Sequence, residues 1–169
     1  MMKRLTAVLL ALALLLSIML LAGIASADDE VNDILGKPFP DFTATDTEGN
    51  IFTLSEVLKD HEAVLINFWA TWCEPCWREF PFLNETFKEY GDRVAVIALS
   101  KEKKDTIEKI AGYRKGNEIN FPMGRDEDLT LFKYVGGGIS VPKTVIVDRF
   151  GNTVHYLFRK YISSREINL

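Results

Sequence analysis

Cysteine is scarce in this chain: its 169 residues hold only Cys73 and Cys76, with two residues between them. A single pair cannot provide the several disulfides that stabilise many small exported domains. A bridge between them closes a loop of four residues, which contributes about 2 kcal/mol in the loop-closure model, against about 3 kcal/mol for fifteen residues. His61 and His155 lie far from the pair in sequence, so a four-ligand zinc site is disfavoured as well.

An excess of positive charge is also absent, because 24 acidic side chains outnumber 20 basic ones. The resulting net charge of −4 argues against binding to nucleic acid. No internal repeat or low-complexity tract is present, and nothing divides the chain into two domains. The three glycines at 136–138 do not link a strand to a helix, so they predict a flexible loop rather than a phosphate site.

One long apolar run is present, from residue 5 to 24, after Lys3 and Arg4 and before Ala-Ser-Ala at 25–27. A basic start, an apolar stretch and an A-x-A sequence are typical of a secretory signal peptide. The run is nearly long enough to span a bilayer, so an uncleaved membrane anchor stays open. Both interpretations predict an extracytoplasmic protein, periplasmic or on the outer face of the membrane. The remaining domain, 28–169, has a net charge of −6 once the two basic residues are removed.

Apolar runs alternate with helical patterns along the rest of the chain. Three runs are almost continuously apolar, as strands covered on both faces are: residues 63–70, 94–100 and 144–148. Three helical patterns accompany them: from the cysteines to about residue 90, from the capping signature Asp105-x-x-Glu108, and over about 127–135. This alternation predicts an α/β fold with a central mixed sheet flanked by helices.

Three shorter signals accompany that pattern. The sequence DFTATDTEGNIFTLSEVLKD predicts a strand, a turn at 48–50, a second strand and a short helix that begins at Ser55. A turn at 150–152 followed by TVHYLF predicts an antiparallel hairpin at one edge of the sheet. The charge run 101–105 predicts a solvated loop.

The cysteines follow the first apolar run, in the sequence NFWATWCEPCWREFP. Pro75 suits the first turn of a helix, which places Cys73 at the helix N-terminus. Free backbone N–H groups and the helix dipole favour a thiolate there, so Cys73 is predicted to be the exposed, attacking sulfur. Cys76, one turn later and more buried, is predicted to resolve the mixed disulfide. This arrangement favours dithiol redox chemistry over a structural disulfide.

Glu79 lies three residues after Cys76 and therefore shares a helix face with it. Spacing alone leaves two interpretations open. Glu79 is either an exposed acid on an amphipathic helix or a partly buried carboxylate that takes a proton from Cys76. Pro81 lacks the N–H that a helix interior needs, so a kink is predicted there.

The sequence FWATWCEPCWREFP resembles the active site of thioredoxin-fold proteins, most closely the exported thiol-disulfide oxidoreductases of the TlpA/ResA type. The resemblance covers about residues 36–158. GKPFPDFTATDTEGN is similar to the family's N-terminal hairpin, and VPKTVIVDRFGNTV to its cis-proline loop and following hairpin. It implies a thioredoxin-like fold with an added N-terminal β-hairpin. The last helix, signalled by Ser163-x-x-Glu166, is expected to be cut short at Leu169.

The resemblance also implies roles for particular residues. Cys73 attacks, Cys76 resolves and Glu79 assists proton transfer. Five further positions are implied to contact substrate, with a cis bond before the last of them: Trp72, Glu74, Pro75, Val141 and Pro142. The implied partners are disulfide-bearing proteins, such as apocytochromes during cytochrome c maturation, and a membrane thiol carrier that donates electrons. The protein is expected to be a monomer without metal, nucleotide or organic cofactor.

The chain departs from the family pattern at two positions, and two alternative functions stay open. Asn67 stands where cytoplasmic thioredoxins have a buried aspartate, and Trp77 stands where Lys or Arg is usual. A peroxiredoxin-like peroxidase is one alternative, although its P-x-x-x-T-x-x-C motif needs Pro and Thr where this chain has Ile66 and Ala70. The other is a non-catalytic module that binds metal through both thiolates, although no nearby His or Met completes a site.

Overall fold

The computed structural model describes residues 34–158, so the expected signal peptide or anchor at 1–27 and the expected helix at Ser163 lie outside the described residues. The elements follow in this order: β1 (Thr43–Thr45), β2 (Ile51–Thr53), α3 (Leu54–Asp60), β3 (Ala63–Trp69), α4 (Glu74–Tyr90), β4 (Val94–Ser100), α5 (Ile107–Gly116), β5 (Met123–Arg125), α6 (Thr130–Tyr134), β6 (Lys143–Asp148) and β7 (Thr153–Phe158). None of the helices between residues 34 and 158 has the length and apolar character needed to cross a membrane.

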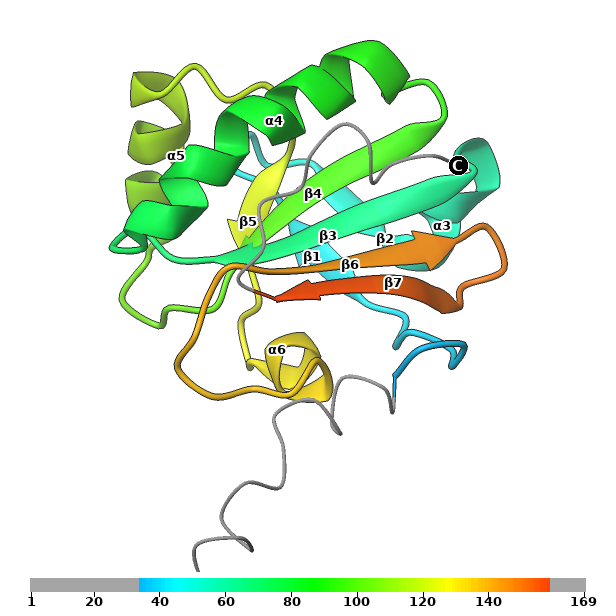
Figure 1. Ribbon diagram of the computed structural model, residues 1–169. Coiled ribbons are helices and arrows are strands. Elements are labelled where there is room, and N and C mark those ends of the chain that lie inside the picture. The colour runs from blue at the N-terminus through cyan, green and yellow to red at the C-terminus, as the bar shows by residue number, and fades with distance from the viewer. Residues whose placement is uncertain (1–33, 159–169) are drawn as a thin grey trace, which may run out of the picture.

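Five strands form a central mixed sheet in the order β5-β4-β3-β6-β7 (Figure 1). β3 pairs in parallel with β4 and antiparallel with β6. At the two edges, β5 runs parallel to β4 and β7 antiparallel to β6. The α/β fold with a mixed sheet, expected from alternating apolar runs and helical patterns, is confirmed.

β1 and β2 form a separate antiparallel hairpin, which confirms the expected N-terminal addition. Its turn is built around Asp46, whose carboxylate accepts hydrogen bonds from the backbone N–H groups of Glu48 (2.8 Å) and Asn50 (2.9 Å). Between them Gly49 has φ of 86°, a conformation that costs glycine little. Local turn chemistry therefore accounts for the hairpin.

β3 lies at the centre of the sheet and is buried along its whole length. Successive side chains of a strand point to opposite faces of the sheet, so the contacts of Phe68 and Trp69 show which helices cover each face. Phe68 packs on Phe132 of α6, with ring centroids 5.8 Å apart. Trp69 packs on Phe80 of α4 at 5.1 Å and on Tyr113 of α5 at 5.0 Å. α4 and α5 thus cover one face of the sheet, as Figure 1 also shows, and α6 packs on the other.

Two helices begin later than the sequence predicts. α5 starts at Ile107 with Thr106 as its N-cap, because the Thr106 hydroxyl accepts the hydrogen bond from the N–H of Lys109 (3.2 Å). The predicted capping role of Asp105 is therefore wrong. α6 is confined to Thr130–Tyr134 because Leu129 has φ of 61°, outside the range of a right-handed helix. α4 continues through Pro81 to Tyr90, and the kink stays a prediction.

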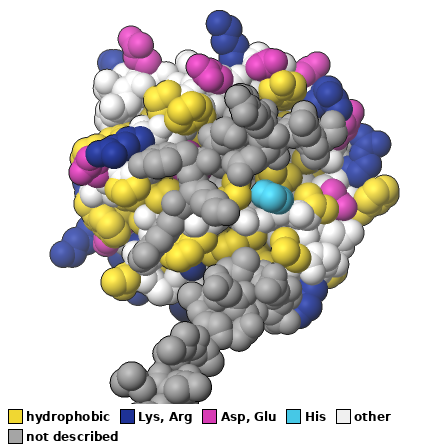
Figure 2. Space-filling model, in the orientation of Figure 1, with side chains coloured by type: hydrophobic (Ala, Val, Ile, Leu, Met, Phe, Trp, Pro, Cys, Tyr) yellow, Lys and Arg dark blue, Asp and Glu magenta, His cyan; other side chains and the backbone are white. Residues whose placement is uncertain are grey.

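The surface has two features in this orientation. Acidic and basic side chains mix around the rim, and hydrophobic side chains form a band over the part of the molecule that carries β6 and β7 (Figure 2). Neither sign of charge dominates this face, in keeping with the small net charge.

Candidate active site

The two cysteines lie where β3 gives way to α4. Cys73 is the N-cap residue of α4, and Pro75 is in the first turn, as the sequence predicts. Cys73 and Cys76 form a disulfide with Cα atoms 5.3 Å apart. The backbone N–H of Cys76 donates a hydrogen bond to Sγ of Cys73 (3.2 Å). The first sulfur therefore takes the place that a capping oxygen usually occupies, at the positive end of the helix dipole.

Exposure does not distinguish the two sulfurs in this oxidised form. Cys73 is 1% exposed and Cys76 is 0% exposed, so the prediction of an exposed first sulfur is wrong for the disulfide. The reason is local, because Sγ of Cys73 is bonded to Cys76 and turned back over the first turn of α4. The feature that separates the two sulfurs is their position relative to the helix N-terminus.

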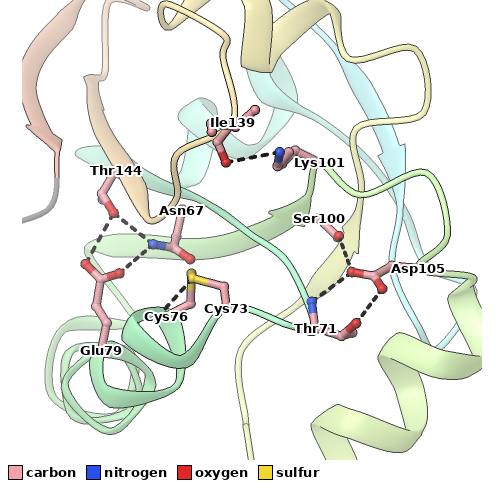
Figure 3. Close-up of a disulfide and its surroundings, with 10 residues drawn as sticks. All are labelled: Asn67, Thr71, Cys73, Cys76, Glu79, Ser100, Lys101, Asp105, Ile139 and Thr144. Carbon is pink, nitrogen blue, oxygen red and sulfur yellow. Dashed lines mark hydrogen bonds between the residues drawn. A yellow bond between two sulfur atoms is a disulfide. The ribbon is translucent and has the colours of Figure 1, made fainter. Parts of the chain in front are cut away.

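Glu79 is buried on the face of α4 that packs against the sheet, with 1% of its surface exposed. Asn67 of β3 and Thr144 of β6 are directly opposite each other in the sheet register, so their side chains share that face. Nδ2 of Asn67 donates to Oε2 of Glu79 (2.9 Å), and the hydroxyl of Thr144 donates to Oε1 (3.4 Å). Figure 3 shows this group beside the disulfide. The interpretation of Glu79 as an exposed acid is therefore excluded.

The environment of Glu79 changes its acidity. Burial in the core disfavours the charged carboxylate, and the hydrogen bonds from Asn67 and Thr144 offset this effect only in part. The pKa of Glu79 is raised to about 7 as a result. A carboxyl group with this pKa exchanges its proton near neutral pH, which is the property required of a general acid or base.

Asp105 supports the turn that leads into Cys73, a role that its place in a charge run did not predict. Its buried carboxylate accepts hydrogen bonds from the backbone N–H (2.9 Å) and hydroxyl (2.5 Å) of Thr71, and from the hydroxyl of Ser100 (2.7 Å). Lys109 adds an ion pair at 2.7 Å. Burial alone would raise the pKa of Asp105, but these hydrogen bonds hold the pKa below its usual value. The predicted solvated loop is therefore wrong at this residue.

We expect Asp105→Ala to lower the free energy of unfolding of the oxidised protein by about 3 kcal/mol, because it leaves the buried hydroxyl of Ser100 and the partly buried donors of Thr71 without an acceptor. Urea denaturation measures this loss. The matched control is Lys109→Met, which removes only the half-exposed ion pair and is expected to cost less than about 1 kcal/mol. Equal losses in the two variants would contradict the bracing role of Asp105.

The exposed rim next to the disulfide carries the first predicted substrate contacts. Trp72 is 53% exposed, and its Nε1–H donates to Glu102 (2.9 Å). Nζ of Lys101 lies 5.4 Å from the Trp72 ring centroid. It also donates a hydrogen bond to the carbonyl of Ile139 (3.3 Å), which Figure 3 shows. Glu74 and Pro75 are exposed as well, and Glu74 forms an ion pair with Arg78.

Val141 and Pro142 lie at the same end of the sheet as the cysteines. β6 begins at Lys143, which pairs with Phe68 near the end of β3. Pro142 therefore adjoins the point where β3 leads into the cysteine turn. The Val141–Pro142 peptide bond is cis, which confirms the implication of the resemblance, and both residues are buried.

The described residues also bear on the two alternative functions. Within residues 34–158, no group of three or more His, Cys, Asp or Glu side chains is placed to hold a metal ion. Ile66 and Ala70, which stand at the motif positions of a peroxidase, are both buried at 0% exposure. Neither side chain carries a group that could bind a peroxide.

Comparison with known proteins agrees with this site. Residues 35–156 match the AhpC/TSA family. The protein named Thiol-disulfide oxidoreductase ResA from Bacillus anthracis is 33% identical over 132 residues, which cover 78% of this chain and 73% of that protein. A thio-disulfide isomerase structure from Thermus thermophilus is 31% identical, with a TM-score of 0.61 over 78% of this chain and 89% of that one.

A second solved structure supports the fold alone. It is the exposed lipoprotein thioredoxin of Streptococcus pneumoniae, 24% identical with a TM-score of 0.65, covering 76% of this chain and 95% of that one. Cys73 and Cys76 stand in the arrangement that thiol–disulfide exchange requires. The chain therefore belongs to the AhpC/TSA family, and it is a thioredoxin-like thiol-disulfide oxidoreductase of the ResA type.

Proposed function

We propose that this oxidoreductase works outside the cytoplasm, where it reduces or exchanges disulfides in partner proteins. The observation that carries the proposal is the position of Cys73, at the N-cap of α4 and in a disulfide with a cysteine one turn later. Such a pair can cycle between dithiol and disulfide, because the helix N-terminus favours the attacking thiolate.

In the proposed reaction, the Cys73 thiolate attacks one sulfur of the substrate disulfide. That S–S bond breaks, the other substrate sulfur leaves and takes up a proton, and a mixed disulfide joins Cys73 to the substrate. Cys76 then loses its proton and attacks Sγ of Cys73, which releases the second substrate thiol. Two electrons and two protons pass to the substrate, and the Cys73–Cys76 disulfide forms. A dithiol donor restores the reduced pair.

Glu79 is proposed to take the proton from Cys76 during the second step. It lies one helical turn beyond Cys76 on the same face of α4, and it is shielded from solvent. Its pKa of about 7 means that roughly half of the molecules hold the carboxylate at neutral pH. The base is therefore available without a large change in pH.

The exposed rim is proposed to bind the substrate segment that carries the disulfide. Trp72 offers a large aromatic surface next to the cysteine turn, and Glu74 and Pro75 continue this surface. Val141 and Pro142 approach from β6. A backbone segment at this place can pair with an extended substrate chain, which makes recognition largely independent of substrate sequence.

The location and the electron donor are proposed from the N-terminal residues. The basic start, apolar run and Ala-Ser-Ala sequence of 1–27 support export through a signal peptide or retention by a membrane anchor. Residues 28–169 are proposed to form the mature domain. A membrane thiol carrier is then the proposed source of electrons, and client proteins such as apocytochromes are the proposed substrates.

Location can be tested with the full chain expressed in a bacterial host. We expect a membrane-impermeant thiol reagent to label the attacking thiol, Cys73, in intact, reduced cells, while a cytoplasmic thiol protein stays unlabelled. N-terminal sequencing then distinguishes a cleaved chain that begins at Asp28 from a retained anchor. Labelling only after cell lysis would contradict the extracytoplasmic proposal.

Activity can be tested by reduction of insulin with dithiothreitol as the electron donor. We expect the parent protein to accelerate insulin reduction, and the double variant Cys73→Ser, Cys76→Ser to leave the rate of dithiothreitol alone. Hydrogen peroxide as the alternative substrate is expected to be consumed no faster than by that double variant. Peroxide turnover that exceeds insulin reduction would favour the peroxidase instead.

A further inference from the structure

The side chain of Asn67 is fully buried between β3 and α4. Of its two polar atoms, only the amide nitrogen Nδ2 forms hydrogen bonds with the described residues. Nδ2 donates one hydrogen bond to Glu79 (2.9 Å) and one to the hydroxyl oxygen of Thr144 (2.8 Å). Oδ1 is also buried and has no hydrogen-bond partner among the described residues. A buried acceptor without a donor is rare, because the loss of its hydration is not compensated.

The orientation of this amide is fixed by its neighbours. Glu79 accepts through both oxygens, and Thr144 already donates its hydroxyl hydrogen to Glu79. When Glu79 is ionised, exchange of the amide oxygen and nitrogen of Asn67 would place Oδ1 against the carboxylate, and the hydrogen bond to Glu79 would be lost. In the structure Nδ2 lies toward Glu79 and Thr144, and Oδ1 lies on the other side of the amide.

On that other side lies the disulfide. Figure 3 shows Oδ1 of Asn67 directed toward the Cys73–Cys76 bridge, with Nδ2 turned to the Glu79 side. Cys76 precedes Glu79 by one turn on the same face of α4, so the residue of β3 that contacts Glu79 also faces Cys76. Sγ of Cys73 already has its own partner, the backbone N–H of Cys76 (3.2 Å).

We propose that Asn67 is the hydrogen-bond acceptor for the Cys76 thiol in the reduced protein, and that its Oδ1 gains its missing donor only when the disulfide is reduced. In the disulfide neither sulfur carries a hydrogen. Reduction by a dithiol breaks the S–S bond, transfers two electrons and places a hydrogen on Sγ of Cys76, while the dithiol becomes a disulfide. The S–H group then donates to Oδ1.

The two sulfurs therefore have hydrogen-bond partners of opposite kinds. A donor, the backbone N–H of Cys76, faces Cys73 and favours its thiolate, whereas an acceptor, Oδ1 of Asn67, faces Cys76 and favours its protonated form. The attacking and resolving roles are thus separated by hydrogen bonding, although both cysteines are equally buried. The satisfied acceptor also stabilises the dithiol relative to the disulfide, so it makes the pair more oxidising.

The first test measures the redox equilibrium against dithiothreitol at about pH 5, below the pKa of Glu79, which is about 7. The hydrogen bonds from Asn67 and Thr144 lower this pKa, so their removal also favours the protonated carboxyl group. This test rests on the proposed function only in assuming that the pair is reduced reversibly. Asn67→Leu removes the acceptor, so we expect the dithiol-to-disulfide ratio to fall roughly tenfold, or about 30 mV toward more negative potential. Thr144→Val disturbs the same network but keeps Oδ1, and is expected to change the ratio less than threefold.

The second test identifies the sulfur without any turnover, so it is independent of the proposed function. In a Cys73→Ser background, infrared spectroscopy of the S–H stretch reports on Cys76 alone. We expect Asn67→Leu to move this band to the higher frequency of a free thiol, while Asn67→Asp, which keeps an oxygen in place, retains the band of the parent. If Asn67→Leu does not fold, Asn67→Val provides the same comparison.

Two results would overturn the proposal. One is an S–H band of Cys76 that is the same with Asn67 and with leucine or valine. The other is a band shift that appears in the Cys76→Ser background instead, because Oδ1 would then serve Cys73. A failure of insulin reduction with an intact band shift would contradict the proposed function and leave the role of Asn67 supported.

Discussion

Cys73→Ser is expected to reduce the rate of insulin reduction to the rate of dithiothreitol alone, whereas Cys76→Ser is expected to accumulate a covalent mixed disulfide with its substrate. Cys73 supplies the thiolate at the N-terminus of α4. Without it only Cys76 remains, which lies one turn into the helix and not at its N-terminus. Without Cys76, the mixed disulfide forms but has no internal thiol to resolve it.

The acidity of Cys73 alone does not explain such a large loss. A fall in the thiol pKa from about 8.5 to about 7 raises the thiolate fraction at pH 7 roughly sixteen-fold. Nucleophilicity falls about five-fold over the same range, so the net gain in rate is about three-fold. The expected loss therefore comes from removing the nucleophile itself, and the helix N-terminus mainly sets the redox equilibrium.

Non-reducing electrophoresis and mass spectrometry of reduced Cys76→Ser, incubated with insulin in the absence of dithiothreitol, provide the measurement. A substrate adduct on Cys73 that dissolves on addition of dithiothreitol is the expected product. The matched control is Trp77→Phe, which changes a half-exposed side chain next to Cys76 but leaves both sulfurs. If Cys76→Ser turned over insulin at the parent rate, or if the adduct formed on Cys76 in Cys73→Ser, the assigned order of the cysteines would be wrong.

Glu79→Gln is expected to make the oxidised protein less sensitive to rising pH. In the folded protein the pKa of Glu79 is about 7, against an ordinary value of 4.5. Between these values the folded state keeps a proton that the unfolded state has lost, so the free energy of unfolding decreases as pH rises. The stabilisation is complete below about pH 4.5, and about 3 kcal/mol of it is lost once the pH has passed 7.

Urea denaturation between pH 4.5 and 8 measures this effect, with the disulfide intact so that neither cysteine titrates. The variant is expected to gain about 3 kcal/mol relative to the parent across this range, because glutamine has no proton to lose. Glu85→Gln, an exposed acid on the same helix, is the control and is expected to follow the parent curve. If the free energy of unfolding depended on pH in the same way in Glu79→Gln and in the parent, the pKa of Glu79 would not be raised by folding.

The sequence predicted those parts of the fold that depend on local pattern. β3, β4 and β6 follow continuously apolar runs, because a strand covered on both faces has no polar side to alternate with. The start of α4 was predictable for a similar reason, since Pro75 and a capping side chain at Cys73 act within one turn. Glu79 could be placed on the face of Cys76, but its burial depends on packing against β3 and β6.

The parts that escaped prediction depend on contacts between distant segments. The sequence around Asp105 is typical of a helix cap, but its carboxylate accepts hydrogen bonds from Thr71 and Ser100 instead. The tertiary structure brings these residues beside it. Asn67 was noticed only because it departs from a family pattern. Its significance follows from the register that sets it opposite Thr144 and from the helix that places Glu79 on the same side, neither of which a single sequence contains.

The reduction potential of the Cys73–Cys76 couple tests the central claim of redox activity most directly. Equilibration of the purified protein in dithiothreitol or glutathione buffers, followed by alkylation and mass analysis, gives the ratio of dithiol to disulfide. We expect a reversible two-electron couple, with about 30 mV for each tenfold change in ratio and a potential above about −300 mV. A potential below about −300 mV, in the range of structural disulfides, or a failure to reoxidise would contradict the account.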